Sequence, residues 1–182
     1  MKSTLIVLYL IFVSITVSGC TSKEADPDQA VDDREFSSAV MTDGKKAADF
    51  ELKTLEGKSI KLSDYKGKIV IIDFWATWCG PCRKGVPDLV ELQNEYKDKL
   101  VVIGISLDQQ NTIKELVPFM KQYGINYPVV LGTQQVVMDY GNIQAIPTSF
   151  LIDQSGNIVD THIGLVSKST YSNMIDKLLK KS

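Results

Sequence analysis

The chain has 182 residues, and its 20 Lys and Arg nearly balance its 22 Asp and Glu, which leaves a formal net charge of −2. A hydrophobic fraction of 44% with 23% charged residues is typical of a globular domain with a buried core. Three cysteines in a chain of this length exclude a small disulfide-stapled scaffold, and a single histidine excludes a multi-histidine metal site. Because the charges balance, the chain has no positive electrostatic field that would attract nucleic acid.

The first 19 residues are typical of a secretory signal peptide. Lys2 supplies one positive charge, residues 4–17 form an almost uninterrupted apolar run, and small residues follow. Because about 20 apolar residues are needed to cross a bilayer, this run is short for a membrane span. A marginal transmembrane anchor is therefore the alternative interpretation.

Residues 20–46 differ in composition from the rest of the chain. They contain seven acidic and four basic side chains but few apolar ones, which show no helical or strand period. Such a segment cannot bury enough surface to offset its chain entropy. The sequence therefore predicts a signal peptide at residues 1–19, a flexible tether at residues 20–46 and one folded domain at residues 47–182.

The first half of this domain alternates strand and helix patterns. Residues 50–53 and 59–62 alternate apolar and polar side chains across a turn, which predicts a hairpin. Residues 68–75 (KIVIIDFW) form a continuous apolar run, typical of a strand buried on both faces. Residues 82–96 have near-helical apolar spacing, and residues 100–107 (LVVIGISL) predict a second buried strand.

The second half continues the alternation and ends in a hairpin and a helix. We predict, in chain order, a helix at 111–123, an extended piece at 127–131, a short helix at 135–140, a hairpin of 149–153 with 157–163, and a helix at 171–179. This order predicts an α/β fold with a mixed central sheet that carries helices on both faces.

The chemistry is concentrated in residues 78–82, Trp-Cys-Gly-Pro-Cys, which follow a buried strand and begin a helix. The free N–H groups and partial positive charge of a helix N-terminus favour a thiolate at Cys79. Pro81 costs no backbone hydrogen bond in the first helical turn. Cys82 lies one turn further along, where it can attack a mixed disulfide on Cys79 and release the product. The pattern therefore predicts a reversible dithiol–disulfide pair.

These residues resemble the thioredoxin superfamily. The resemblance rests on residues 74–82 (FWATWCGPC), Pro87 and residues 146–148 (Ile-Pro-Thr). Within the superfamily, the predicted amino-terminal hairpin and the insert at residues 111–140 are similar to the TlpA-like membrane-anchored thiol-disulfide oxidoreductases. The resemblance covers residues 47–182 and implies a thioredoxin-like three-layer fold that needs no cofactor.

The resemblance also implies roles for individual residues. Cys79 would be the exposed nucleophile and Cys82 the buried resolving thiol. Pro147 matches the cis-proline that faces the disulfide and aligns the substrate backbone, although the residues alone leave an ordinary trans turn open. Asp73 matches a buried acid that takes the proton of the resolving cysteine through water, and burial would raise its pKa. A solvated strand end is the alternative for Asp73, and residues 101–105 lack the lysine that thioredoxins place nearby.

Residues 17–20, Val-Ser-Gly-Cys, resemble the lipobox of bacterial lipoproteins. The resemblance implies cleavage before Cys20 and a diacylglycerol on its sulfur, which would hold the protein to a lipid bilayer outside the cytoplasm. A spare thiol is the alternative for Cys20. By the same kind of resemblance, electrons would come from a membrane donor of the cytochrome c maturation type, and apocytochrome c would be a substrate.

The predicted function is therefore that of an extracytoplasmic thiol-disulfide oxidoreductase acting on protein disulfides. The dipeptide between the cysteines is that of reducing thioredoxins, which favours reduction over oxidation. A thiol peroxidase is the second interpretation, but it would need Ser or Thr three residues before the cysteine, where this chain has Ala76. A metal-binding module is the third, and it has only Cys20 and His162 as further ligands. We expect His162 to be a solvent-facing strand residue.

Overall fold

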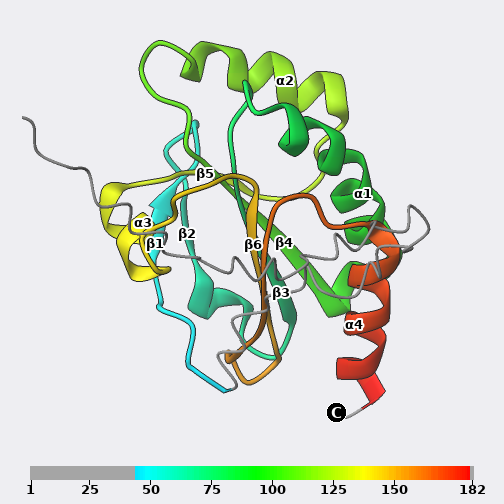
Figure 1. Cartoon of the computed structure of the whole chain (residues 1–182). Helices are drawn as coiled ribbons and strands as arrows, with labels where there is room; N and C mark the ends of the chain where they lie inside the picture. The colour runs from blue at the N-terminus through cyan, green and yellow to red at the C-terminus, as the bar shows by residue number, and fades with distance from the viewer. Residues whose placement is uncertain (1–43, 181–182) are drawn as a thin grey trace, which may run out of the picture. The chain divides into compact units, whose positions relative to one another are not determined.

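The computed structural model describes residues 44–180 (Figure 1). The predictions for the signal peptide, for Cys20 and for nearly all of the tether lie outside the described residues. Among the described residues, no helix has both the length and the apolar character required to cross a bilayer.

A five-stranded mixed sheet forms the centre of the domain, in the order β5-β4-β3-β6-β7. Its strands are β3 (Ile69–Trp75), β4 (Leu100–Ser106), β5 (Val129–Leu131), β6 (Thr148–Ile152) and β7 (Ile158–Ile163). Strands β3, β4 and β5 are parallel, whereas β6 is antiparallel to both β3 and β7. A separate antiparallel pair consists of β1 (Glu51–Lys53) and β2 (Ser59–Lys61).

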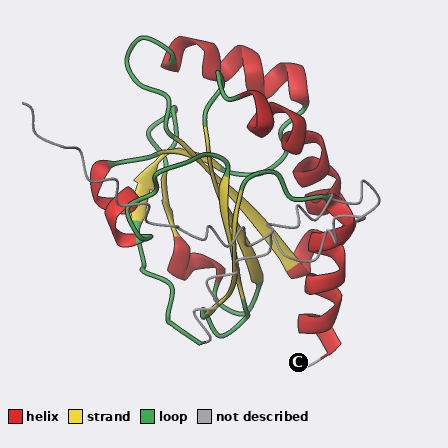
Figure 2. Cartoon of the chain, viewed as in Figure 1, coloured by secondary structure: helices red, strands yellow, loops and turns green. Residues whose placement is uncertain are grey.

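The helices lie on both sides of the sheet, which confirms the predicted three-layer arrangement (Figure 2). They are α1 (Gly80–Tyr96), α2 (Leu116–Tyr123), α3 (Gln134–Asp139) and α4 (Lys168–Lys180). Three short 3-10 helices complete the fold: η1 (Leu62–Tyr65), η2 (Lys97–Lys99) and η3 (Ile113–Glu115). The helix predicted at residues 111–123 is therefore divided, because a turn and η3 precede α2.

Every residue of β3 is buried, as expected for a central strand, and its side chains alternate between two cores. Ile71 and Trp75 belong to the core beneath α1, α2 and α4. Ile72 and Phe74 pack on the other side, with residues of the β1–β2 pair and of α3. Because side chains two residues apart share a face, Asp73 lies on the same side as Ile71 and Trp75.

The first described residues pair with the turn between β6 and β7. The Ala47 N–H donates to the Gly156 carbonyl at 3.0 Å, and the Ile158 N–H donates to the Lys45 carbonyl at 2.8 Å. This turn follows β6, whereas Pro147 immediately precedes β6. The chain therefore enters the domain at the end of the sheet remote from Pro147.

Strand β4 has a glycine, Gly104, directly beside the buried Asp73. It is the register partner of Asp73 on β4, and a Cβ there would lie 2.8 Å from Trp75 Nε1 and 3.3 Å from Tyr127 Cε2. The two rings occupy the space that a lysine at this position would need. Sequence comparison with thioredoxins indicates only the missing cation, while the structure shows its steric cause.

Gly104→Ala is expected to lower the free energy of unfolding by about 2 kcal/mol, since overpacking a rigid core costs roughly 1–3 kcal/mol. Urea unfolding of the oxidised protein measures the change. Gly80→Ala is the matched control, because apart from its chain neighbours and the nearby backbone of α1 no heavy atom lies within 4 Å of the position that its Cβ would take. Equal stability of Gly104→Ala and the wild-type protein would mean that the two rings move aside freely.

Candidate active site

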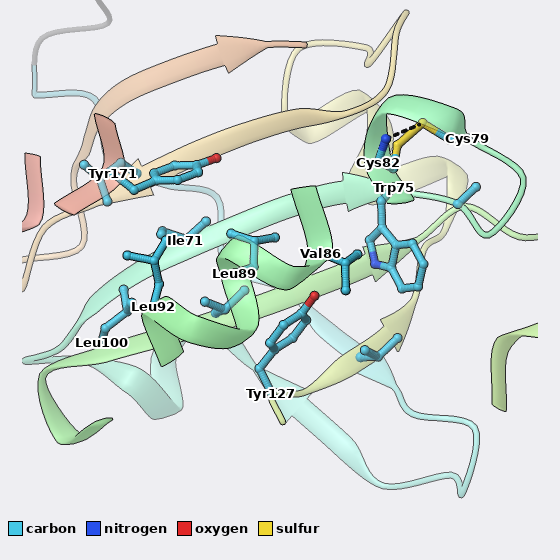
Figure 3. Packing of buried hydrophobic residues seen from close by; sticks show 14 of the residues in the cluster. Ile71, Trp75, Cys79, Cys82, Val86, Leu89, Leu92, Leu100, Tyr127 and Tyr171 are labelled. Atoms are coloured by element: carbon cyan, nitrogen blue, oxygen red, sulfur yellow. Dashed lines mark hydrogen bonds between the residues drawn. A yellow bond between two sulfur atoms is a disulfide. The ribbon is translucent and has the colours of Figure 1, made fainter. Parts of the chain in front are cut away.

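Cys79 and Cys82 form a disulfide at the start of α1, with their Cα atoms 5.3 Å apart. Cys79 is the N-cap of the helix, and its Sγ accepts a hydrogen bond of 3.2 Å from the Cys82 N–H. The two residues are 5% and 3% exposed, so the expectation of an exposed Cys79 is wrong for the disulfide form. Figure 3 shows the pair at the end of β3, beside Trp75.

The loop before β6 lies against the disulfide. The Ile146–Pro147 peptide bond is cis, and the Ile146 carbonyl oxygen is 3.6 Å from Cys79 Sγ. The Thr148 hydroxyl donates to the Ala145 carbonyl at 2.8 Å, and the Gly164 N–H donates to the Pro147 carbonyl at 2.8 Å. These bonds fix the loop at the sulfur atoms, where a substrate backbone would have to approach.

Apolar side chains surround this end of the sheet. Trp78 is 61% exposed and borders a groove of about 350 Å³ that Leu107 and Thr112 also line. Leu165 is 53% exposed and lines a small cavity together with Cys82. Exposed apolar groups near a reactive bond are typical of a surface that binds other proteins.

Arg83, in the first turn of α1, does not point toward the sulfur atoms. Its Nε donates to the Tyr123 hydroxyl at 3.4 Å, and its guanidinium lies 5.8 Å from the ring centroid of Phe119. The side chain is therefore directed toward α2. The positive end of the helix, with the Cys82 N–H, is the main stabilising influence on a Cys79 thiolate.

Asp73 is buried, at 6% exposure, in the middle of β3. The alternative of a solvated strand end is therefore wrong. Burial in apolar surroundings raises the pKa of Asp73 to about 8, since the charged form loses its hydration. A cavity of about 20 Å³ is lined by both Asp73 and Cys82, which brings the acid and the resolving sulfur to one water-sized space.

Asp108 is a site residue that sequence reasoning missed. Its carboxylate accepts hydrogen bonds from the Thr77 N–H at 3.0 Å, the Thr77 hydroxyl at 2.6 Å and the Ser106 hydroxyl at 2.9 Å. The Asp108 N–H donates in turn to the Ser106 hydroxyl at 3.1 Å. Thr77 precedes the Trp78-Cys79 pair, so Asp108 fixes the segment that leads from β3 to the disulfide. An Asp in a loop 29 positions from Cys79 has no local sequence signal for this role.

Asp108→Asn is expected to lower the free energy of unfolding by about 2 kcal/mol, because an amide N–H₂ would face a donor where the carboxylate accepts several bonds. Urea unfolding at neutral pH measures the effect. Asp139→Asn is the control, because the exposed Asp139 carboxylate accepts only one side-chain bond, of 2.7 Å from Gln135. An Asp108 variant as stable as this control would contradict the anchoring role.

His162 is not the solvent-facing residue that the sequence suggested. Its side chain is 22% exposed, its ring meets Tyr171 edge-on at 6.3 Å between centroids, and its Nε2 is 3.4 Å from Asp160. Strand β7 directs it toward α4 because His162 is the register partner of Ser149, which lies in the core. Among residues 44–180, no group of three or more His, Cys, Asp and Glu side chains is arranged to hold a metal ion.

Comparison with known protein families assigns the chain to a family. The model of the AhpC/TSA family matches residues 44–161. The chain belongs to the AhpC/TSA family. Thioredoxin-like protein YneN of Bacillus subtilis is 37% identical over 137 residues, which are 75% of this chain and 80% of that protein. Thiol-disulfide oxidoreductase ResA of Bacillus thuringiensis is 41% identical over 138 residues, or 76% of this chain and 79% of the relative.

Solved structures agree with this assignment. A thiol:disulfide interchange protein of the thioredoxin family from Chlorobium tepidum superposes with a TM-score of 0.67 and is 34% identical, over 75% of this chain and 97% of that one. These similarities confirm the resemblance to TlpA-like proteins. This AhpC/TSA family member is a thioredoxin-like thiol-disulfide oxidoreductase with Cys79 and Cys82 as its disulfide-capable pair.

Proposed function

We propose that the protein reduces disulfides of other proteins outside the cytoplasm, with Cys79 as the attacking thiol and Cys82 as the resolving thiol. The observation that carries the proposal is the Cys79–Cys82 disulfide at the N-terminus of α1, facing the Ile146–Pro147 loop. A helix N-terminus stabilises a thiolate, and a fixed loop beside the sulfur can align an extended substrate segment.

In the first step, the Cys79 thiolate attacks one sulfur of the substrate disulfide. A bond forms between the Cys79 sulfur and that substrate sulfur, and the second substrate sulfur leaves with the electron pair and takes a proton. The Cys82 N–H, which already lies 3.2 Å from Cys79 Sγ, stabilises the thiolate before the attack. The exposed Trp78 provides apolar surface for the substrate chain, and the neighbouring groove adds the polar side chains of Gln109, Asn111 and Thr112.

In the second step, Cys82 loses its proton and attacks the Cys79 sulfur. The Cys79–Cys82 bond forms, the bond to the substrate breaks, and the substrate sulfur leaves as a thiolate that is protonated from solvent. The ionised form of Asp73 accepts the Cys82 proton through water. Because the pKa of Asp73 is about 8, this form is a minor fraction at neutral pH and increases toward pH 8. Two electrons pass from the protein dithiol to the substrate disulfide.

The amino-terminal sequence and the family support a further proposal about location and partners. A lipid on Cys20 holds the protein to the outer side of a membrane, and residues 20–46 connect that lipid to the domain. An electron donor in the same membrane returns the Cys79–Cys82 pair to the dithiol. Apocytochrome c, whose paired haem-attachment cysteines must be reduced, is the proposed substrate. The relative named thiol-disulfide oxidoreductase ResA supports the reaction class.

Insulin reduction with dithiothreitol tests the proposed reaction, with peroxide consumption by the same reductant measured in parallel. We expect fast insulin reduction, slow peroxide consumption and a reducing midpoint potential in a redox titration. A potential as high as that of the strongest disulfide donors, about −120 mV, would contradict the reducing role. Faster removal of peroxide than of insulin disulfides would favour the thiol peroxidase interpretation.

A further inference from the structure

The cavity beside Asp73 has the size and the lining of a site for a single water. Its volume of about 20 Å³ is enough for one molecule, and a buried water usually has two to four polar partners. Three of the lining residues have polar side chains: Asp73, Cys82 and Tyr171. The other lining residues are glycines, a proline and apolar side chains, namely Gly85, Leu89, Pro147, Gly164, Leu165 and Val166.

Tyr171 is the one of these three that the reaction steps above do not use. It is 4% exposed, and its hydroxyl donates a hydrogen bond of 2.6 Å to the hydroxyl of Ser149, which is 2% exposed. Ser149 is the register partner of Asp73 on the neighbouring strand β6. The hydrogen bond offsets the cost of burying the two hydroxyls, and the pair places polar atoms next to the buried acid.

The position of Tyr171 relative to Cys82 is fixed by contacts between their helices. The Lys168 N–H, in the first turn of α4, donates to Asp88 of α1 at 2.9 Å. The Lys168 ammonium forms ion pairs with Glu91 at 2.9 Å and with Glu95 at 3.0 Å, both on α1. Figure 3 shows Tyr171 and the disulfide on the same side of the sheet, where both belong to one core. The distance between the Tyr171 hydroxyl and Cys82 is therefore set by packed helices.

We propose that Tyr171, held by Ser149, is a positioning residue that fixes the water through which the Cys82 proton reaches Asp73. The inference rests on the proposed function, since it concerns the second step of that reaction. Cys82 gives its proton to the water, and the water gives a proton to the Asp73 carboxylate. The Cys82 sulfur then forms its bond to the Cys79 sulfur as the bond between Cys79 and the substrate sulfur breaks, and the substrate sulfur leaves as a thiolate. Without the Tyr171 hydroxyl the water loses a hydrogen-bonding partner beside Asp73 and Cys82 and is poorly oriented for the transfer.

The groups that face Asp73 come from every element packed against it. They are Cys82 from α1, Tyr171 from α4, Ser149 from β6, Gly104 from β4, Tyr127 from the segment before β5, and His162 with Asp160 one strand further on β7. Burial is the largest cause that raises the pKa of both Tyr127 and Tyr171, and the negative charge of Asp73 is the second. Both tyrosines therefore stay neutral at physiological pH. Tyr171 therefore acts as a neutral hydrogen-bonding group.

The test is a stopped-flow reaction of the reduced protein with a symmetric aromatic disulfide whose thiolate product absorbs visible light. Every variant carries Cys20→Ser, so that no third thiol contributes to the signal. The first thiolate is released in a concentration-dependent phase by Cys79, and the second in a concentration-independent phase by Cys82. Tyr171→Phe is expected to slow the second phase about tenfold near pH 7 and to change the first phase less than about twofold.

Two further variants keep the test independent of folding effects. Ser149→Ala, which releases the Tyr171 hydroxyl, should slow the second phase about threefold. Tyr140→Phe is the matched control, because it also removes a buried hydroxyl, one that donates to the Ala48 carbonyl at 2.8 Å in the core on the other face. This control should leave both phases unchanged. The slowing should disappear at alkaline pH, where a thiol ionises without assistance.

The possible failures are distinguishable. A wild-type second phase in Tyr171→Phe, an equal slowing in Tyr140→Phe, or a slowing that persists at alkaline pH would overturn the positioning role of Tyr171. Absence of the first phase in the Cys20→Ser protein would instead overturn the proposed function.

Discussion

Cys79→Ser is expected to abolish disulfide reduction, with turnover below about a thousandth of the wild-type value, because a hydroxyl does not replace a thiolate as the nucleophile. Cys79 is the N-cap residue beside the Ile146–Pro147 loop, where a substrate would approach. Cys82 lies one turn further into α1, which gives it no direct access to a protein substrate. Insulin reduction with dithiothreitol measures the loss. Turnover well above the background would mean that Cys82 attacks substrates directly.

Cys82→Ser should stop the reaction at the mixed disulfide, since the first step still occurs and the second cannot. Mixed disulfides between Cys79 and substrate proteins then accumulate and are seen as high-mass bands on non-reducing gels, which disappear when dithiothreitol is added. Mass spectrometry of these bands identifies the partners. Cys20→Ser is the control that keeps the dithiol pair intact. If Cys82→Ser accumulates no adduct, the order of attack assigned to the two sulfur atoms is wrong.

Asp73→Asn is expected to stabilise the oxidised protein strongly at alkaline pH. The pKa of Asp73 is about 8 in the folded protein and near the ordinary aspartate value of 3.8 in the unfolded chain. Between these two pH values the folded state retains a proton that the unfolded state releases, so the wild-type free energy of unfolding falls as pH rises from about 4 to 8. Each pKa unit corresponds to about 1.4 kcal/mol, so the variant should gain on the order of 5 kcal/mol at pH 8 relative to pH 4.

Urea unfolding of the oxidised form at pH 4, 6 and 8 measures this gain, which should grow steadily across the three values. Asp98→Asn serves as the control because Asp98 is exposed on η2, and it should follow the wild-type curve. A constant difference between Asp73→Asn and wild type at all three pH values would show that the Asp73 carboxyl is already ionised in the folded protein at pH 4.

Local patterns predicted most of the architecture. The apolar run of β3 and the pentad at residues 78–82 depend on neighbouring residues alone, and both lie where they were expected. The helix α1 begins at Gly80 rather than at residue 82, because Cys79 acts as its N-cap. The helix α4 begins at Lys168 rather than at residue 171, and contacts with α1 hold its first turn.

The residues that the sequence did not reveal act through contacts between distant segments. Asp108 lies 31 positions from the Thr77 that it anchors, and Tyr171 lies 22 positions from Ser149. Polar residues of these types are common in loops and helices, and nothing in their neighbourhood marks them. Only the register of β6 against β3 brings Ser149 opposite Asp73 and so gives the polar group a place in the site.

The pairing of Ala47 with the β6–β7 turn has a mechanical consequence. A force applied through the residues before Lys45 acts on the end of the sheet opposite the sulfur atoms of Cys79 and Cys82. If the domain is attached to a membrane through Cys20, as proposed, the end of the sheet that carries the Cys79–Cys82 disulfide is the end remote from the attachment. Changing the number of residues between Cys20 and Lys45 should then change how far the domain reaches from the proposed attachment, while the rate of exchange with a small disulfide should stay the same.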